Sequence, residues 1–405
     1  VPGQYGLEKT LVEYLDHQVS LFHELRRVLR PDALCFVNIG SSYAATRSYQ
    51  VPDSKHKDVG NDLPGLVPAG YKPLDLIDVP DRLCEALRAD GWYLRSKIVW
   101  QKKKPMPESL SGTRWTRHRV KVGTIRGLTR KQDTSPGAFT AMSGGSGDLP
   151  EYASCPGCAK CSPNGGLVLR RGNWRPTSSY EYILMLGNSK NCYADGEGVR
   201  EPAIGTSHER PFGKQGNSDR KDQGRTWTES NGRNLRNVWR LKSGNFSGAH
   251  FATFPKSLAE RTIRIGTSER GCCPQCGSQW ARVVEREIGE RTGGHKGRGF
   301  VDVNGPRNMQ DMIPCRIISR TLGWRPTCRC PGLDGDAPGS ACADESNWPT
   351  VPATVIDPFV GSGTTAVVAQ EMDRRWIGID ISRAYLDMAV KRLQQAGAPQ
   401  TSIGI

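Results

Sequence analysis

The sequence predicts an α/β fold in which the strands of one doubly wound sheet follow a circularly permuted order along the chain. Apolar runs of strand length alternate with amphipathic helical segments near the start and again near the end of the 405 residues. A glycine-rich turn joins a strand to a helix close to the end, and only 48 residues follow Asp357, where this turn begins. Because so short a segment can form only part of such a sheet, the other strands must lie upstream.

The upstream strands are expected in two stretches that flank a long polar insertion. Apolar residues recur at helical spacing from about Thr10 to Leu29, which predicts an amphipathic helix. Leu34–Ile39 is an apolar run typical of a buried parallel strand. The pattern further predicts a helix over 75–90, a strand over 92–100, a strand over 180–186 after the insertion, and a helix over 254–265.

The last part of the chain predicts a strand–turn–helix–strand–helix unit. Its expected elements are the strand Ala353–Ile356, the turn Asp357–Gly363, the helix Thr364–Met372, the strand Trp376–Ile379 and the helix Ser382–Gln395. Glycines in the turn allow the backbone to bend sharply and to approach a ligand closely. Asp380 follows Gly363 by 17 residues, at the end of the second strand, where a carboxylate can accept both ribose hydroxyls of an adenosine. The alternative interpretation is a tight turn beside a solvated carboxylate.

The turn is typical of a site for S-adenosylmethionine rather than for a dinucleotide. A dinucleotide-binding turn usually carries a third glycine three residues after the second, and Ala366 stands at that position. The carboxylate of Asp357 would repel a pyrophosphate but would attract a positively charged sulfonium group. The sequence therefore predicts S-adenosylmethionine as the cofactor.

The excess positive charge of the chain lies in its middle. The net charge is +15, and residues 95–242 hold 27 basic and 12 acidic residues, so the flanking parts are balanced. Such an excess usually faces a polyanion, and the tryptophans between the charges favour nucleic acid over a merely solubilising surface, which is the alternative. No run approaches the roughly 18 apolar residues of a membrane span, so we expect no membrane partner.

Thirteen cysteines, several in short-spaced clusters, indicate metal binding in a reducing cytoplasm rather than disulfides. One four-thiolate zinc site is expected from Cys273, Cys276, Cys328 and Cys330, with Cys272, Cys315 and Cys342 as substitutes. A second candidate cluster consists of Cys155, Cys158 and Cys161, which Cys192 could complete. Cysteine-only sites leave no coordination position for water, so both zinc ions would be structural. The alternative is a set of free, buried thiols.

Several segments resemble the motifs of the β class of DNA amino-methyltransferases. Asp357–Thr365 resembles the cofactor loop of that family, and Gly378–Ser382 is similar to the acidic motif that follows it. His250–Pro255, which opens a helix, resembles the family's other cofactor motif, which flanks the methionine moiety. The segment from Gly3 to Tyr43 is similar to the one that follows the family's catalytic motif. The resemblance covers most of the chain except parts of the basic insertions.

The resemblance implies a circularly permuted, Rossmann-like, S-adenosylmethionine-dependent methyltransferase sheet of the α/β class. The implied reaction is methyl transfer to the N4 amino group of cytosine or the N6 amino group of adenine in double-stranded DNA, after the base is flipped out. The residues implied to contact the cofactor are Asp357, Phe359, Gly361, Gly363, Thr364, Asp380, His250, Phe254 and Asn38. The alternatives are a satisfied turn residue for Asn38 and a helix-entry staple for His250 and Phe254.

The same resemblance divides the chain into five regions. They are the catalytic half over 1–100, basic target-recognition insertions over 101–245 that include the strand 180–186, a cofactor-flanking helix over 246–269, a cysteine-rich zinc insertion over 270–350, and the S-adenosylmethionine-binding half over 351–405. The resemblance also implies a cytoplasmic protein of a bacterium, archaeon or phage. A cognate restriction endonuclease and a second copy of the chain are further implied partners.

One motif of the family does not occur in this sequence. The family holds the target amino group with (Asp/Asn/Ser)-Pro-Pro-(Tyr/Phe/Trp), and the 405 residues contain no Pro-Pro dipeptide. The family would place this motif shortly before Gly3, so we expect Val1 to lie a few residues beyond it, and no catalytic residue is assigned. Two alternatives stay open, namely an inactive zinc-bearing DNA-binding protein and an RNA methyltransferase with the same cofactor loop.

Overall fold

The computed structural model describes residues 5–6, 8, 10–44, 70–103, 105, 110–125, 149–201, 233–242, 254–288, 317–330 and 349–397. Its α-helices are α1 (Leu11–Val28), α2 (Val79–Ala89), α3 (Lys256–Gly266), α4 (Thr364–Glu371) and α5 (Arg383–Gln395). Two short 3-10 helices are η1 (Ser162–Asn164) and η2 (Glu197–Val199). No helix in this part of the chain combines the length and apolar character that crossing a membrane needs.

The strands form one larger sheet and several two-stranded pairs. They are β1 (Leu34–Ile39), β2 (Tyr93–Lys102), β3 (Arg114–Arg117), β4 (Arg119–Ile125), β5 (Leu149–Ser154), β6 (Leu167–Arg170), β7 (Tyr180–Gly187), β8 (Val238–Leu241), β9 (Trp280–Ile288), β10 (Ile317–Pro326), β11 (Thr354–Asp357) and β12 (Arg375–Gly378). The main sheet has the order β1-β7-β2-β8, and the pairs are β3–β6, β4–β5, β9–β10 and β11–β12.

The direction of β7 corrects one prediction. The sequence predicts β1 as a parallel strand, but its hydrogen-bonded neighbour β7 runs antiparallel to it and also to β2. The reason is that the chain returns to the sheet at the end where it left: Gln101 pairs with Tyr180, and the amide of Lys102 donates to the carbonyl of Ser179 at 2.9 Å. The long insertion between β2 and β7 therefore projects from the tip of an antiparallel pair.

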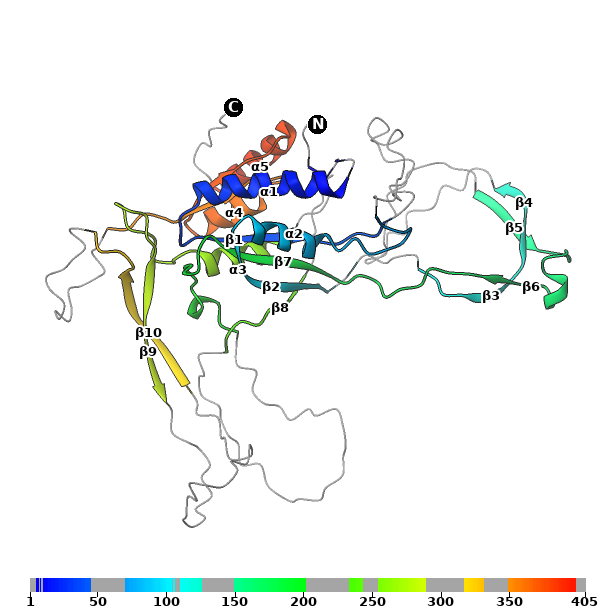
Figure 1. Ribbon diagram of the computed structural model, residues 1–405, viewed down its shortest axis with the longest axis horizontal. Coiled ribbons are helices and arrows are strands. Elements are labelled where there is room, and N and C mark those ends of the chain that lie inside the picture. Colours follow the sequence, from blue (N-terminus) through cyan, green and yellow to red (C-terminus); the bar gives the residue numbers. More distant parts are fainter. Residues whose placement is uncertain are drawn as a thin grey trace, which may run out of the picture.

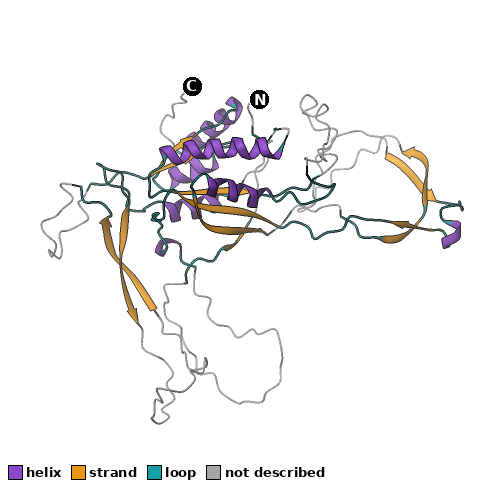
Figure 2. Ribbon diagram, viewed as in Figure 1, coloured by secondary structure: helices purple, strands orange, loops and turns teal. Residues whose placement is uncertain are grey.

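Helices cover both faces of the main sheet, as Figures 1 and 2 show. Side chains alternate along a strand, so Leu184 and Leu186 of β7 pack against α1 and α2 on one face. Ile183 points to the other face and packs with Leu258 and Ile265 of α3. These two apolar clusters produce the three-layer arrangement of the α/β class, which confirms the predicted fold class.

The C-terminal strands β11 and β12 form a parallel pair that α4 connects. Ile356 of β11 packs against the cluster between the main sheet and the helices α1 and α2. Val368 of α4 packs against Ile263 of α3, so this unit shares the core of the main sheet. The strand–turn–helix–strand order is the predicted one, and it comes last along the chain, as the permuted order requires.

Two predicted boundaries move for local reasons. The second helix begins at Val79 rather than near residue 75, because Asp78 adopts a left-handed conformation with φ of 56° and the preceding Leu76 forms a bridge to Tyr43. The following strand continues to Lys102, since β8 pairs with it in parallel as far as Leu241. By contrast, the first helix begins where the sequence predicts, with a capping box between Thr10 and Glu13.

Candidate functional site

The glycine-rich turn lies at the end of β11, directly before α4. Gly361 and Gly363 adopt positive φ angles of 49° and 81°. A Cβ at Gly363 would stand 2.8 Å from the Cβ of Ala389 on α5, so only glycine allows the turn to approach this helix so closely. The amide of Gly363 donates to the carbonyl of Val360 at 2.7 Å and closes the turn. The turn thus has the conformation that the sequence predicts, and its ligand contacts stay a prediction.

Asp357 holds the turn from the end of β11. Its Oδ1 accepts the amide of Phe359 at 3.0 Å, and its Oδ2 accepts the hydroxyl of Thr365 at 2.6 Å. Burial raises the pKa of the Asp357 carboxyl above its usual value, although these two hydrogen bonds lower it, and the charge of Asp380 adds to the rise. A bound cation would act in the opposite direction, because a nearby positive charge favours the ionised carboxylate.

Asp380 joins the turn to the start of α5. Its Oδ2 accepts the amide of Gly361 at 2.9 Å, and its Oδ1 accepts the amide of Ser382 at 2.8 Å. An ionised carboxylate has about four acceptor positions, so both oxygens keep a lone pair for a further donor. The structure therefore fixes the direction of this carboxylate while leaving it able to bind the hydroxyls of a ribose.

The other residues predicted to contact the cofactor are placed differently. Phe359 is 47% exposed, and its ring packs edge-to-face on Tyr5 with the centroids 5.7 Å apart. Thr364 is buried beneath the turn. Phe254 packs against the apolar clusters around α3 and α4. His250 lies outside the described residues.

Asn38 lies on β1, in the main sheet rather than in the turn. Its side-chain amide donates to Oε2 of Glu181 at 3.0 Å and to the carbonyl of Tyr182 at 3.1 Å, both on β7. Its amide hydrogens are therefore engaged by the neighbouring strand, which favours the structural alternative for this residue. The two sheets are nonetheless adjacent, because Cys35 of β1 and Ile356 of β11 pack against the same apolar cluster.

The four cysteines of the predicted zinc site come together. The sulfur atoms of Cys273, Cys276, Cys328 and Cys330 all lie within 4.8 Å of one another, although 51 residues separate the second from the third. The antiparallel pair β9–β10 brings the two ends together by placing Pro326 opposite Trp280. The hydroxyl of Ser278, 3.2 Å from Sγ of Cys276, lowers the pKa of that thiol to about 6. A thiolate is the form that binds a metal ion.

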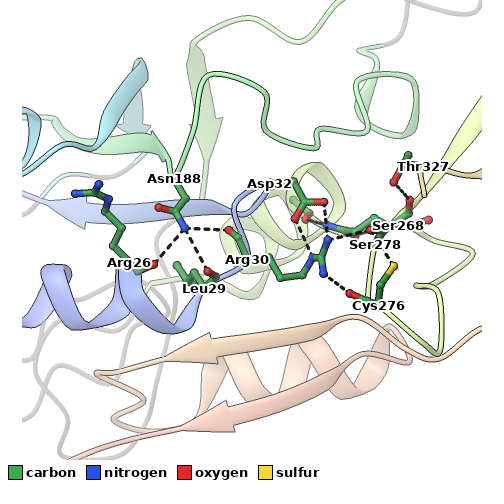
Figure 3. A network of polar contacts seen from close by, with 11 residues as sticks. Arg26, Leu29, Arg30, Asp32, Asn188, Ser268, Cys276, Ser278 and Thr327 are labelled. Carbon is green, nitrogen blue, oxygen red and sulfur yellow. Dashed lines mark hydrogen bonds and ion pairs between the residues drawn. The ribbon is translucent and has the colours of Figure 1, made fainter. Parts of the chain in front are cut away.

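Arg30, which follows α1, links this four-cysteine cluster to the main body (Figure 3). Its guanidinium donates to the carbonyl of Cys276, to Oγ of Ser278 at 3.0 Å and to Oδ1 of Asp32 at 2.9 Å. In the same view the amide of Asn188, just after β7, donates to the carbonyls of Arg26, Leu29 and Arg30 at 3.0–3.2 Å. The end of α1 is thus fixed between the main sheet and the cluster.

The second cysteine cluster contains a histidine that the sequence analysis missed. His118 joins Cys155, Cys158 and Cys161, and the four ligand atoms lie within 4.8 Å of one another. No spacing rule connects a residue 37 positions upstream with a Cys-x-x-Cys-x-x-Cys run. A weak signal exists, because His118 is the only histidine between residues 101 and 200.

Two of the proposed substitutes, Cys192 and Cys272, take part in neither described cluster. The expectation that Cys192 completes the second cluster is wrong, because its thiol lies after β7 and donates to the carbonyl of Ser189 at 3.0 Å. Cys272 is buried beside the first cluster, and its backbone pairs with Val351. Cys315 and Cys342 lie outside the described residues.

A parallel strand pair with a glycine-rich turn, an acidic residue after the second strand, and helices on both faces of the adjoining sheet define the class of α/β proteins that bind a nucleoside-containing cofactor. A profile of the N6 and N4 DNA methylases matches residues 2–274 and 351–391, so the chain belongs to the DNA methylase family. The members of this family are S-adenosylmethionine-dependent enzymes. The unmatched stretch 275–350 contains β9 and β10.

Individual relatives are type II methyltransferases. The chain is 28% identical to methyltransferase M.Cfr9I of Citrobacter freundii over 395 residues, which are 97% of this chain and 76% of that protein. It is 25% identical to M.SmaI of Serratia marcescens over 392 residues, 96% of this chain and 77% of that protein. Among solved structures, the cytosine-N4-specific PvuII DNA methyltransferase aligns with 98% of this chain and 79% of its own, at 11% identity and a TM-score of 0.40.

Proposed function

We propose that this protein transfers a methyl group from S-adenosylmethionine to the exocyclic amino group of cytosine (N4) or adenine (N6) at a specific sequence of double-stranded DNA. The observation that carries this proposal is the glycine turn with Asp380 fixed beside it, in a chain that belongs to the DNA methylase family. Such a role implies a cytoplasmic location and a cognate restriction endonuclease that cuts the same sequence.

The chemistry sets two requirements for the protein. An exocyclic amine is a poor nucleophile, because its lone pair is conjugated with the ring. The target base must leave the stack, and its nitrogen must be aligned with the methyl carbon of the cofactor, because this alignment removes much of the entropic cost of the reaction step. The cofactor, when bound, supplies a methyl group made electrophilic by a sulfonium. No covalent intermediate with the protein is needed.

The residues of the turn suit the parts of this cofactor. The free lone pairs of Asp380 suit the ribose hydroxyls, and the exposed ring of Phe359 offers an apolar face to an adenine. Gly363 lets the turn approach α5, and Gly361, which also has a positive φ, adds no side chain that would crowd a ligand at the turn. The carboxylate of Asp357 places negative charge near the position of a sulfonium.

The central basic region suits the second substrate. Residues 95–242 carry the whole net charge of the chain, and neutralising phosphates with lysine and arginine supplies most of the sequence-independent affinity for DNA. Side chains that reach base edges from the same region would then select the target sequence.

We also propose that Cys273, Cys276, Cys328 and Cys330 bind one zinc ion. The close approach of their sulfur atoms supports this proposal. Four thiolates saturate a tetrahedral zinc ion, so the ion would stabilise the fold rather than take part in methyl transfer.

Binding of the cofactor tests the assignment of Asp380. Asp380→Asn keeps the shape but removes the charge, and we expect affinity for S-adenosylmethionine, measured by isothermal calorimetry, to fall about 10- to 100-fold, as for the loss of a charge-assisted bidentate contact. Asp387→Ala is the matched control, because this exposed carboxylate of α5 pairs with Arg383 on the same helix, at 3.1 Å. Unchanged affinity in Asp380→Asn would refute the ribose assignment.

Methyl transfer tests the function itself. The product of the whole reading frame that contains these residues is incubated with methyl-labelled cofactor and either unmethylated duplex DNA or RNA. Analysis of the digested nucleosides should detect N4-methylcytosine or N6-methyladenine in DNA, which also identifies the target base. Label in RNA alone would support the RNA methyltransferase alternative, and DNA binding without any label would support the inactive one.

A further inference from the structure

The insertion at the tip of β2 and β7 forms a module of its own, which we call the distal module and define as the described residues 110–125 and 149–175. It contains two antiparallel ladders, β3–β6 and β4–β5. Figure 1 shows these strands at one end of the molecule, away from the helices that cover the main sheet. None of the apolar clusters formed by described residues includes a residue of this module.

The distal module has no hydrophobic core of its own among the residues whose burial is described. Among residues 110–124 and 151–175, whose burial is described, Cys161 is the single buried one, whereas large side chains such as Trp115, Tyr152 and Trp174 are 47–66% exposed. Two short two-stranded ladders are at best marginally stable in water without a packed face. Some other interaction must therefore hold this module together.

The buried thiol belongs to the second cluster, whose geometry fits a tetrahedral metal ion. Sγ of Cys158 lies 3.7 Å from Sγ of Cys161 and 3.3 Å from Nδ1 of His118. A zinc ion with Zn–S bonds of about 2.3 Å and a Zn–N bond of about 2.0 Å would separate two sulfurs by about 3.8 Å and a sulfur from a nitrogen by about 3.5 Å. A disulfide would require about 2.05 Å between the sulfurs, so the distances exclude that bond.

The backbone holds the four ligands at the junction of the two ladders. His118 is the one residue between β3 and β4, and Cys155 directly follows β5. The amide of Cys155 donates to the carbonyl of His118 at 2.9 Å, and the amide of Cys161 donates to the carbonyl of Cys158 at 3.0 Å. Gly166, just before β6, accepts from the amide of His118 at 2.9 Å. All four strands of the module therefore meet at this cluster.

We infer that His118, Cys155, Cys158 and Cys161 bind one zinc ion, and that this ion takes the place of a hydrophobic core in a module that presents a basic surface to DNA. Three thiolates and one neutral imidazole complete the coordination, and the thiol protons pass to solvent on binding. Since the unfolded module has no preformed site, the free energy of metal binding becomes folding free energy.

The charges of the module point to a polyanionic ligand, and this part of the inference rests on the proposed function. Its described residues include eight lysines and arginines but one acidic residue, Glu151. Arg114 stands directly opposite Arg170 in the β3–β6 ladder. Like charges at opposite positions destabilise a ladder by themselves, but a phosphate group between them would offset this repulsion. The exposed tryptophans add faces on which bases or sugars can pack.

The zinc content of variants tests the metal site. Wild-type protein, purified with zinc and dialysed, should hold two zinc ions per chain by elemental analysis, and Cys158→Ser should hold one. His118→Cys should keep two, because a cysteine can replace the histidine as a ligand. Cys192→Ser is the matched control and should also keep two, since this thiol lies outside both clusters. An unchanged zinc content in Cys158→Ser would overturn the inference.

Affinity for DNA tests the role of the metal. Fluorescence anisotropy with a labelled, mixed-sequence DNA duplex should show about a tenfold or greater loss in Cys158→Ser and none in Cys192→Ser, because several phosphate contacts are lost with the module. Binding of S-adenosylmethionine should be unchanged in both variants. Loss of one zinc ion without loss of DNA affinity would overturn the DNA role. Failure of methyl transfer alone would count against the proposed function but not against the zinc site.

Discussion

The two cysteine clusters differ in what surrounds them. The four-cysteine cluster adjoins the main body, where Cys273 and Trp280 are fully buried and Arg30 donates to the loop between them. The cluster around His118 adjoins only two short ladders, in which Cys161 is the single buried residue among those described. The zinc ions that we propose would thus reinforce an existing core in one place and take the place of a core in the other.

The two clusters also differ in the polar contacts that join their strands to the main body. Arg282 of β9 donates to both carboxylate oxygens of Asp195, at 2.8 and 2.9 Å, and the hydroxyl of Tyr193 donates to the carbonyl of Trp280 at 3.1 Å. These bonds join the β9–β10 pair to residues that follow β7. The distal module is joined to the body mainly through its two connecting segments, which run so close together that a Cβ at Gly172 would stand 1.7 Å from the carbonyl oxygen of Ser111.

The largest expected effect is on the unfolding of the main body. Cys273→Ser should lower its free energy of unfolding by about 3 kcal/mol or more, because a fully buried ligand is lost together with the metal. Cys158→Ser should change the same transition by less than about 0.5 kcal/mol, since the distal module shares no apolar cluster with the body. Urea unfolding followed by tryptophan fluorescence measures both values.

Hydrogen exchange supplies the control for this pair of variants. In Cys158→Ser, the amides of β3 to β6 should lose their protection against hydrogen exchange, while the amides of β7 keep theirs. This result is expected because the distal module would unfold locally while the main body stays folded. Equal loss of protection in both regions would show that the two clusters stabilise a single cooperative unit.

An intermediate effect is expected at the anchor of the four-cysteine cluster. Arg30→Ala should lower the free energy of unfolding by about 1–2 kcal/mol, because the carbonyl of Cys276 and the hydroxyl of Ser278 lose a charged donor. Arg27→Ala is the control, since this neighbouring arginine forms an exposed ion pair with Glu24 on the same helix. If both variants lose the same stability in urea, Arg30 is not the anchor that the contacts indicate.

The smallest expected effect concerns the paired arginines of the distal module. Arg170→Ala should reduce the slope of log affinity for DNA against log salt concentration by about 1, which is the contribution of one phosphate contact. It should also stabilise the β3–β6 ladder by a few tenths of a kcal/mol, since Arg114 loses its like-charged neighbour. Arg383→Ala on α5 is the control for charge alone. If Arg170→Ala and this control show the same dependence of DNA affinity on salt concentration, Arg170 does not contact a phosphate group of the DNA.

Local sequence patterns predicted much of the fold and of the turn. Helical spacing identified α1, and the glycines of the turn identified the strand–turn–helix unit, because these signals depend only on neighbouring residues. The pairing of β7 could not be predicted in the same way. Its direction depends on where the chain re-enters the sheet after an insertion, and no residue of β1 or β7 records this.

In the metal clusters, ligands close together in the sequence could be predicted, whereas distant ligands could not. Cys-x-x-Cys runs were visible in the sequence, because their members lie within one turn of chain. His118 was missed and Cys192 was wrongly chosen, since ladder pairing decides which distant side chain reaches the cysteines. Asn38 shows the same limit, because only the neighbouring strand reveals that its amide is engaged by Glu181.

The sequence by itself determined the α/β class, the permuted order, the glycine turn with Asp380, and the central position of the positive charge. Each of these is a property of composition or of residues close together in the chain. Only the tertiary structure decided the direction of β7, the histidine in the second cluster, and the absence of a buried apolar core among the described residues of the distal module. These depend on contacts across long separations, which are selected by the free energy of the whole fold rather than by local preference.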